Sequence, residues 1–190
     1  MSEHHPNPAE FVSRAGAKLQ AALDQFAIDP SGWTCADLGC NTGGFTDCLL
    51  QSGASRVYAV DTGYGALAWK LRKDDRVVVL ERTNALHLEL PEPVDLVVID
   101  VAWTRQHRIL PAARKLLKPS APIISLIKPH YEADPTLLTK GVLTPEAAAQ
   151  VLEDTLRNLE LAGFGAKGTI ASPIVGRKGN VEYLTLFKPN

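Results

Sequence analysis

Apolar residues follow two alternating patterns along the chain, one with a helical period and one in short continuous runs. The first helical stripe lies within residues 11–26, where Leu19, Ala22, Leu23 and Phe26 are spaced i, i+3, i+4 and i+7. Short apolar runs bounded by glycine, proline or polar residues are typical of strands buried on both faces. We therefore predict strands over residues 33–38, 56–60, 77–81, 94–99, 123–127, 166–171 and 181–187. We predict helices over residues 11–26, 44–52, 66–73, 106–117 and 145–162.

The order of these elements predicts an α/β fold. Strands that alternate with helices, several of them near-continuous apolar runs, indicate a mostly parallel sheet with helices on both faces. In such sheets ligands bind beyond the carboxyl ends of the strands, where the strand order reverses. Four polar residues lie at those ends, namely Asp37, Asp61, Asp100 and Lys128. Their shared position predicts a binding site at this edge of the sheet.

Length and composition are typical of one globular domain. The 190 residues are 45% hydrophobic and 22% charged, and no apolar run approaches the length of a membrane-spanning helix. We predict a short disordered lead-in over residues 1–10, which has no apolar signal core, and one domain over residues 11–190. Cys35, Cys40 and Cys48 form no CxxC pair, which disfavours a zinc site or a disulfide framework and fits a reducing cytoplasm.

The net charge of −1 argues against a strongly basic nucleic-acid binder. Positive charge is nevertheless clustered locally, because Arg14 and Lys18 are one helical turn apart and Arg177 and Lys178 share a glycine-flanked loop. Taken singly, each pair is more simply solvated surface charge. Any binding of RNA must therefore use such local patches and not the whole surface.

A glycine-rich turn, DLGCNTGG, follows the first strand at residues 37–44. It lacks the G-x-G-x-x-G dinucleotide fingerprint, but glycines in a strand-to-helix turn let the backbone approach a ligand closely. The N-terminus of the next helix favours an anion, such as the carboxylate of a methionine. Asp37 is placed to accept from a methionine ammonium, and Asp61 lies where an acidic residue binds ribose hydroxyls. Alone, the turn could simply close a βα unit.

With Asp61 in place, we favour a nucleoside cofactor at this turn. The expected cofactor-binding residues are Asp37, Gly39, Asn41, Thr42, Gly43, Gly44, Asp61 and Asp100.

Two lysines carry the candidate chemistry. A ribose 2′-hydroxyl is a poor nucleophile at neutral pH, so direct transfer to it needs a base at hydrogen-bonding distance and a donor held in line. A lysine can act as that base only if burial or a second cation lowers its pKa. Lys128, at the end of the fifth strand, is the candidate base, and Lys18 could supply the second charge and bind the target phosphate. Alone, Lys128 would be a surface lysine.

Further side chains flank this predicted site. Glu182 opens an apolar strand, where it either pairs with a lysine or occupies an edge position that faces water. Trp103 and Tyr131 could wall the cleft and stack on a base, although core packing is the commoner role of tryptophan. His130 is in the same loop as Lys128 and could contact the substrate. The histidines have no metal-ligand spacing, and the expected mechanism uses no metal.

Seven segments then carry a resemblance to a known family: VSRAGAKL (12–19), GGFTDCL (43–49), YAVDTGYG (58–65), LAWKL (67–71), ERTNA (81–85), VDLVVIDV (94–101) and IKPHYE (127–132). They resemble the hemolysin A-type (TlyA) ribosomal RNA methyltransferases of the FtsJ-like ribose 2′-O-methyltransferase group. The resemblance covers residues 11–190 and implies a Rossmann-like methyltransferase fold of seven strands, the last one antiparallel. It also implies S-adenosylmethionine as the methyl donor.

The same resemblance implies roles for individual residues. A Lys-Asp-Lys-Glu catalytic tetrad falls on Lys18, Asp100, Lys128 and Glu182, and Lys128 is similar to the lysine nearest the attacking hydroxyl. Asn84 falls on the segment that lines the adenine pocket in the family.

The implied function is ribose 2′-O-methylation of RNA, with ribosomal RNA or a ribosomal subunit as partner and no membrane role. Family members usually carry an N-terminal S4-like RNA-binding domain, whereas this chain begins almost directly at the methyltransferase helix. The S4 portion is therefore expected to be either naturally absent or trimmed away. Two alternatives stay open: a methyltransferase for a non-RNA substrate, which the near-neutral charge favours, and a non-catalytic protein that binds the cofactor or RNA. The sequence leaves the oligomeric state open.

Overall fold

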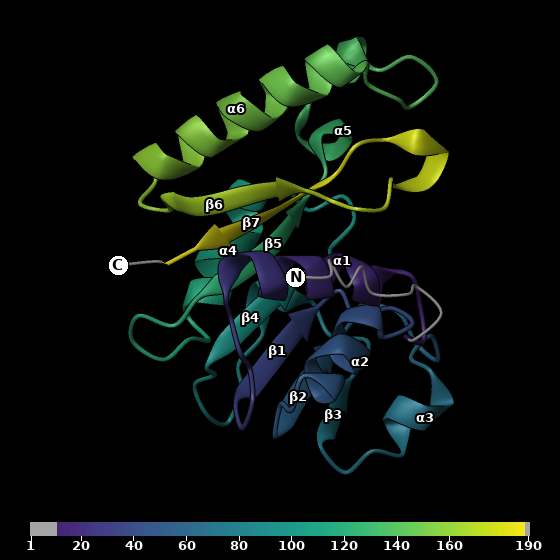
Figure 1. The fold of residues 1–190 in the computed structure, drawn as a ribbon, viewed down its shortest axis with the longest axis vertical. Coiled ribbons are helices and arrows are strands. Elements are labelled where there is room, and N and C mark those ends of the chain that lie inside the picture. Colours follow the sequence, from purple (N-terminus) through teal and green to yellow (C-terminus); the bar gives the residue numbers. More distant parts are fainter. Residues whose placement is uncertain (1–10, 189–190) are drawn as a thin grey trace, which may run out of the picture.

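A computed structural model describes residues 11–188, apart from the side chain of Arg177. The lead-in predicted over residues 1–10 lies outside the described residues. Seven strands form one sheet (Figure 1). They are β1 (Thr34–Leu38), β2 (Arg56–Val60), β3 (Val77–Leu80), β4 (Leu96–Ile99), β5 (Ile123–Ile127), β6 (Ala166–Ala171) and β7 (Tyr183–Phe187).

The strand order is β3-β2-β1-β4-β5-β7-β6. Strands β1 to β5 pair in parallel, while β7 is antiparallel to both β5 and β6. The predicted α/β fold, with a mostly parallel seven-stranded sheet and an antiparallel last strand, is therefore confirmed. The chain order reverses between β1 and β4, and a doubly wound sheet places its ligand at that point.

Helices cover both faces of the sheet. They are α1 (Ala15–Phe26), α2 (Gly44–Gln51), α3 (Trp69–Arg72), α4 (Gln106–Arg114), α5 (Pro129–Glu132) and α6 (Pro145–Leu161), with short 3₁₀ turns η2 (Ala85–His87), η3 (Pro135–Leu137) and η4 (Arg177–Gly179). Figure 1 shows α1 and α2 in front of the sheet and α4 behind it, with α6 along the β6 edge. Among the described residues, no helix is both long and apolar enough to cross a membrane.

The alternation of side chains along the central strands divides the core in two. In β4, Leu96 and Val98 pack with α1 and α2, whereas Val97 and Ile99 pack with α4 on the other face. All four side chains are fully buried. A strand covered on both faces has no polar side to show, which explains why the apolar runs of the sequence are continuous.

Element boundaries differ from the prediction where tertiary contacts intervene. Helix α1 begins at Ala15 and not at residue 11, because the Phe11 ring lies directly against Gly16 and residues 11–14 turn back. Helix α3 is limited to Trp69–Arg72, since the extended Ala68 donates its backbone N–H to the Thr42 carbonyl (3.0 Å).

The start predicted for the long helix α6 is confirmed. The Thr144 hydroxyl accepts from the backbone N–H of Ala147 (3.2 Å), and Pro145 occupies the first helical position. At the other end of the chain, β7 begins at Tyr183, so Glu182 precedes the strand and does not open it.

Candidate active site

A cavity of about 660 Å³ lies at the carboxyl ends of the central strands, where the strand order reverses. The predicted site residues that line it are Lys18, Asp37, Gly39, Asn41, Thr42, Gly44, Asp61, Asn84, Asp100, Lys128 and Glu182. Gly43 alone of the predicted set does not line the cavity. The structure thus brings together residues from seven separate segments of the chain.

The glycines of the turn are required by contacts within the protein. Gly39 has φ +89°, and a Cβ there would lie 2.6 Å from the backbone carbonyl oxygen of Asp100. Gly43 has φ +99°, and its Cβ would lie 2.3 Å from Leu71 Cδ1, so it faces apolar packing and not the cavity. A side chain would clash at both positions, in a conformation that glycine alone adopts readily. Close approach of protein segments, and not only of a ligand, explains this glycine-rich pattern.

Asp61 joins two loops at one end of the cavity. Its carboxylate accepts from the backbone N–H of Asn41 (2.9 Å) and of Gly63 (2.7 Å). Its backbone carbonyl also accepts from the N–H of Thr83 (2.9 Å). Asn84, next to Thr83, uses its side-chain oxygen to accept from the N–H of Leu86 (3.0 Å). Hydrogen bonds from backbone N–H groups therefore hold both polar side chains in place.

Asp37 is a fully buried carboxyl group with one free oxygen. Thr46 donates its hydroxyl to Oδ2 (2.7 Å), while Oδ1 has no hydrogen-bond partner among the described residues. Burial raises the pKa of Asp37 to about 7, with a smaller contribution from Asp100, while the Thr46 hydrogen bond opposes the shift. A buried acceptor without a partner is costly, so this oxygen calls for a donor or a cation from a ligand.

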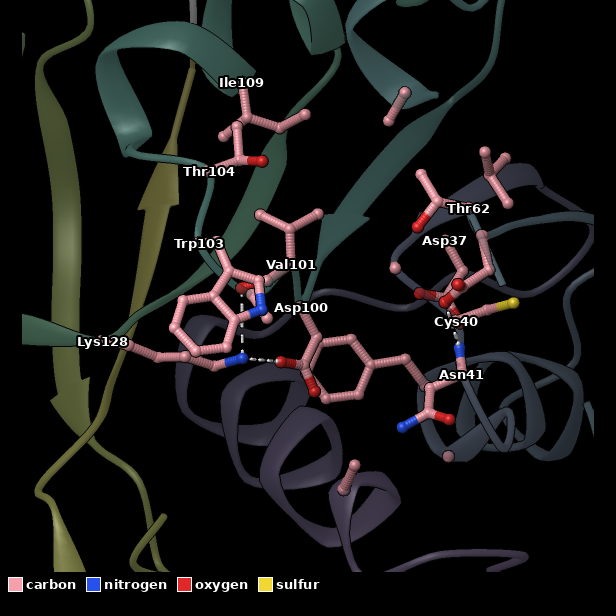
Figure 2. Close-up of a pocket in the computed structure, with 18 of the residues that line it drawn as sticks. Asp37, Cys40, Asn41, Thr62, Asp100, Val101, Trp103, Thr104, Ile109 and Lys128 are labelled. Carbon is pink, nitrogen blue, oxygen red and sulfur yellow. Dashed lines mark hydrogen bonds and ion pairs between the residues drawn. The ribbon is translucent and has the colours of Figure 1, made fainter. Parts of the chain in front are cut away.

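Two ion pairs occupy the other half of the cavity. The Lys128 ammonium lies 2.6 Å from Asp100 Oδ1 and donates to the Val101 carbonyl (3.1 Å). Lys18 pairs with Glu182, and these residues are only 6% and 4% exposed. Figure 2 shows Lys128 and Asp100 pointing toward one another, with Asp37 at the opposite end of the cavity. The four residues of the implied tetrad therefore form two neighbouring pairs.

The burial of Glu182 decides between two interpretations of that residue. The interpretation of Glu182 as an edge residue that faces water is wrong, because Glu182 is buried and pairs with Lys18 from α1. A Cβ on Gly176 would lie 2.2 Å from Glu182 Oε1, so the loop before β7 is folded tightly against the carboxylate. The same pair neutralises the Lys18 charge that we expected to contact a phosphate.

Aromatic side chains surround the Lys128 end of the cavity. Trp103 is 81% exposed, so core packing is the wrong interpretation of this tryptophan. Its ring centroid lies 5.0 Å from that of Tyr131, whose ring is 4.2 Å from that of His130. Trp103 has φ +64°, a conformation that is unfavourable for a bulky residue. Strain of this kind concentrates at functional sites, which supports a role in contacting a ligand.

The surroundings of His130 favour its neutral ring. Burial lowers its pKa, and the nearby Lys128 lowers it further, while Glu182 opposes both. Its Nδ1 is buried and has no hydrogen-bond partner within residues 11–188.

Neither metals nor reactive thiols are prominent in the described part of the chain. No group of three or more His, Cys, Asp or Glu side chains there is arranged to hold a metal ion. All three cysteines are free and buried, and burial raises the pKa of the Cys35 thiol to about 12. Cys40 lines the cavity, and burial likewise raises its thiol pKa above the ordinary value. It therefore contributes an uncharged, weakly polar surface.

Several cavity residues were not identified from the sequence. They include Ser13, Thr62, Thr83 and Thr104. Thr46 was also missed, although its hydroxyl holds Asp37. Small polar residues such as these occur in most loops and carry no periodic signal, so only the folded arrangement distinguishes them.

Comparison with known proteins shows to which family this chain belongs. The model of the FtsJ-like methyltransferase family matches residues 11–188. The 16S/23S rRNA (cytidine-2′-O)-methyltransferase TlyA of Mycobacterium tuberculosis is 44% identical over 179 residues, which is 91% of this chain and 66% of TlyA. Hemolysin A of Brachyspira hyodysenteriae is 38% identical over 187 residues, covering 94% of this chain and 77% of that protein.

A solved structure described as a "putative hemolysin from Streptococcus thermophilus" shares the fold with a TM-score of 0.90. It is 37% identical, with 95% of this chain and 67% of that chain covered. The chain covers 66% of the length of TlyA, which is slightly less than two thirds.

Proposed function

The chain belongs to the FtsJ-like methyltransferase family, and we propose that it transfers a methyl group from S-adenosylmethionine to a ribose 2′-hydroxyl of RNA. The observation that carries the proposal is the position of the Lys128–Asp100 pair at one end of a cavity whose other end holds the unsatisfied Asp37 carboxyl. One end of the cavity is thus equipped for proton transfer and the other for binding a cationic cofactor.

The proposed substrate is ribosomal RNA. The relative from Mycobacterium tuberculosis is named as an rRNA (cytidine-2′-O)-methyltransferase, and the identity of 44% extends over 91% of this chain. A cytidine ribose within ribosomal RNA or a ribosomal subunit is therefore the first candidate target.

The residues at the Asp37 end fit the methyl donor. The free Oδ1 of Asp37 offers an acceptor to the ammonium of the donor's methionine part. Asp61 is fixed by two backbone N–H groups at the end of β2, where an acidic residue binds ribose hydroxyls. Asn84 lines the cavity beyond Asp61, where its amide would contact the adenine. The chemistry of these groups suits a ligand that joins an amino acid to a nucleoside.

The Lys128 end fits the acceptor hydroxyl. When bound, the donor would supply an electrophilic methyl group carried on a sulfonium. After the methyl group is transferred, the sulfur remains as a neutral thioether. Lys128 is the proposed acceptor of the 2′-hydroxyl proton, which it takes up as the new oxygen–carbon bond forms. Asp100 holds the Lys128 side chain in position at 2.6 Å. Lys18 and Glu182 form the adjoining wall, so all four members of the proposed tetrad contribute to the geometry.

Trp103 is proposed to hold the target base. Its ring is exposed at the mouth of the cavity and lies beside Tyr131, close to the proposed base Lys128. Stacking on such a ring is worth about 1–3 kcal/mol per base and does not depend on sequence. A stacked base would leave its ribose free to face Lys128.

The proposal is tested by offering the protein S-adenosylmethionine with a labelled methyl group. The acceptors are ribosomal RNA, assembled ribosomal subunits, and an RNA whose target nucleotide lacks the 2′-hydroxyl. We expect label in RNA that survives alkaline hydrolysis as a 2′-O-methyl dinucleotide, and none in the 2′-deoxy control. Donor binding by calorimetry without label in any RNA would contradict the proposal. That outcome would favour a non-RNA substrate, which the net charge of −1 also permits.

The raised pKa of Asp37 predicts a pH dependence of donor binding. Because the group titrates at about 7 in the folded protein, it is neutral at lower pH and cannot pair with the donor ammonium. We expect donor affinity to rise with pH between about 5.5 and 7.5, by up to about tenfold per unit below the pKa. The donor's own ammonium titrates at about 7.7–8.0, above this range. Calorimetric titration of Asp37→Asn should show weaker binding with no such rise.

The same group has a defined effect on stability. Its pKa in the folded protein exceeds the unfolded value of about 3.9, so the native state binds more protons between about pH 4 and 7. The contribution of Asp37 to stability therefore falls as pH rises through that range, and Asp37→Asn should remove the fall. An equal pH profile of the melting temperature in both proteins would contradict a buried, titrating Asp37.

A further inference from the structure

A second group of exposed side chains lies outside the cavity and has no part in the mechanism above. It consists of Tyr64, Trp69, Lys73 and Arg82, which we call the cation–aromatic patch. Tyr64 is 71% exposed and Trp69 is 68% exposed, although large aromatic rings are usually covered to a greater extent. The patch is carried by the segment between β2 and β3 and by the residues that follow β3.

Each ring of the patch is paired with a cation. The Arg82 guanidinium carbon lies 4.2 Å from the centroid of the Tyr64 ring, and Lys73 Nζ lies 5.0 Å from the centroid of the Trp69 ring. Neither Arg82 nor Lys73 forms an ion pair with a carboxylate within residues 11–188. Their positive charges are thus available to an anionic partner, unlike the carboxylate-paired charge of Lys70 next to Trp69.

The patch is built on a fixed frame. The Glu81 carboxylate accepts from the backbone N–H of Gly65 (2.8 Å) and pairs with Arg72 of α3, so one side chain joins the Tyr64 loop to the Trp69 helix. The backbone N–H of Arg82 donates to the Gly63 carbonyl (3.0 Å). These contacts place the two rings and their cations on one scaffold, which limits the entropy lost on binding.

The patch adjoins the cofactor end of the cavity. Thr62 and Thr83 line the cavity. Tyr64 comes two residues after Thr62, and Arg82 directly precedes Thr83. In Figure 1, α3 lies near the β3 edge of the sheet, at the opposite end of the molecule from α6. The target ribose is expected at the Lys128 end, so the patch is positioned beyond the cofactor and not over the reacting atoms.

We infer that the cation–aromatic patch binds a single-stranded segment of the substrate RNA that flanks the target nucleotide. Exposed aromatic rings accept stacked bases of any sequence, and unpaired cations beside them neutralise phosphates, which is how single-stranded nucleic acids are held without sequence readout. A protein partner would need carboxylates placed opposite both cations, whereas an RNA strand presents a phosphate at every nucleotide. The inference rests on the proposed function for its choice of RNA, and it adds a binding surface that the reaction itself does not require.

The test measures RNA binding separately from catalysis. A short, fluorescein-labelled single-stranded RNA of mixed sequence is titrated with the protein, and anisotropy gives the dissociation constant. We expect the double variant Tyr64→Ala/Trp69→Ala to bind at least about tenfold more weakly than the wild type. Tyr64→Phe/Trp69→Phe keeps both rings and should stay within about threefold. Leu161→Ala, at an apolar residue of α6 that is 83% exposed, is the matched surface control and should have no effect.

The two cations give an independent signature. In Lys73→Gln/Arg82→Gln, the slope of log affinity against log salt should fall in magnitude by about 1.4, because each phosphate contact on a single strand contributes about 0.7. Affinity for S-adenosylmethionine, measured by calorimetry, should be unchanged in every patch variant. In the transfer assay, loss of the rings should raise KM for RNA with little change in kcat.

The outcomes separate this inference from the proposed function. If the ring-free variant binds RNA as well as the wild type does, or if the wild type binds no single-stranded RNA, the inference is overturned. Methyl transfer to RNA by the wild type would still support the proposed function in either case. Conversely, patch-dependent RNA binding without any transfer would support the patch and contradict the proposed enzyme activity.

Discussion

Methyl transfer should be lost when Lys128 is replaced by alanine, while donor binding persists. The variant removes the proposed proton acceptor, and a positioned base typically contributes a factor of about 10² to 10⁴ in rate. Lys128 lies at the proposed catalytic end of the cavity, away from Asp37, so we expect the donor to bind still. Single-turnover transfer to RNA gives the rate of the chemical step, and calorimetry gives the donor affinity.

Two controls sharpen this expectation. Lys128→Arg keeps the positive charge but supplies a group that is not deprotonated in proteins, so it should be nearly as inactive as the alanine variant. Lys115→Ala removes an exposed lysine just beyond α4 and should transfer at the wild-type rate. If Lys128→Arg retained full activity, charge alone would suffice, and the role of proton acceptor would have to be withdrawn.

The fold was predictable because its physical signal is repeated along the chain. Several strands appear as apolar runs, and β4 and β5, which are covered on both faces, are the clearest. Helix α6 was equally clear because Thr144 and Pro145 mark its start. Errors arose at helix ends such as the start of α1, where the packing of the Phe11 ring against Gly16 accompanies the boundary.

The site was predictable in its membership and less so in its geometry. Residues at the ends of parallel strands must meet, so Asp37, Asp61, Asp100 and Lys128 could be grouped from the sequence alone. The partner of each lysine depends on side-chain directions that no sequence period specifies. Likewise, Trp103 is exposed and adopts a left-handed backbone conformation, neither of which its residue type would predict.

Removing Glu182 should destabilise the protein more than any change to an exposed ion pair. Lys18 is only 6% exposed and pairs with Glu182, so Glu182→Leu would leave a buried charge without its partner. Breaking such a pair typically costs about 3–5 kcal/mol. Urea denaturation of the variant and the wild type, under conditions where both refold, measures this loss. As the control, Lys118→Ala removes the half-exposed partner of Asp95 and should cost at most about 1 kcal/mol.

A second variant separates stability from catalysis at the same pair. Lys18→Met/Glu182→Leu replaces both charges with apolar side chains of similar size, which for buried pairs is often neutral or stabilising. We expect its unfolding free energy to return to within about 1 kcal/mol of the wild type, whereas methyl transfer stays low because two members of the proposed tetrad are missing. Should activity return together with stability, the pair would serve only to hold α1 against the start of β7. Catalysis would then rest on Lys128 and Asp100 alone.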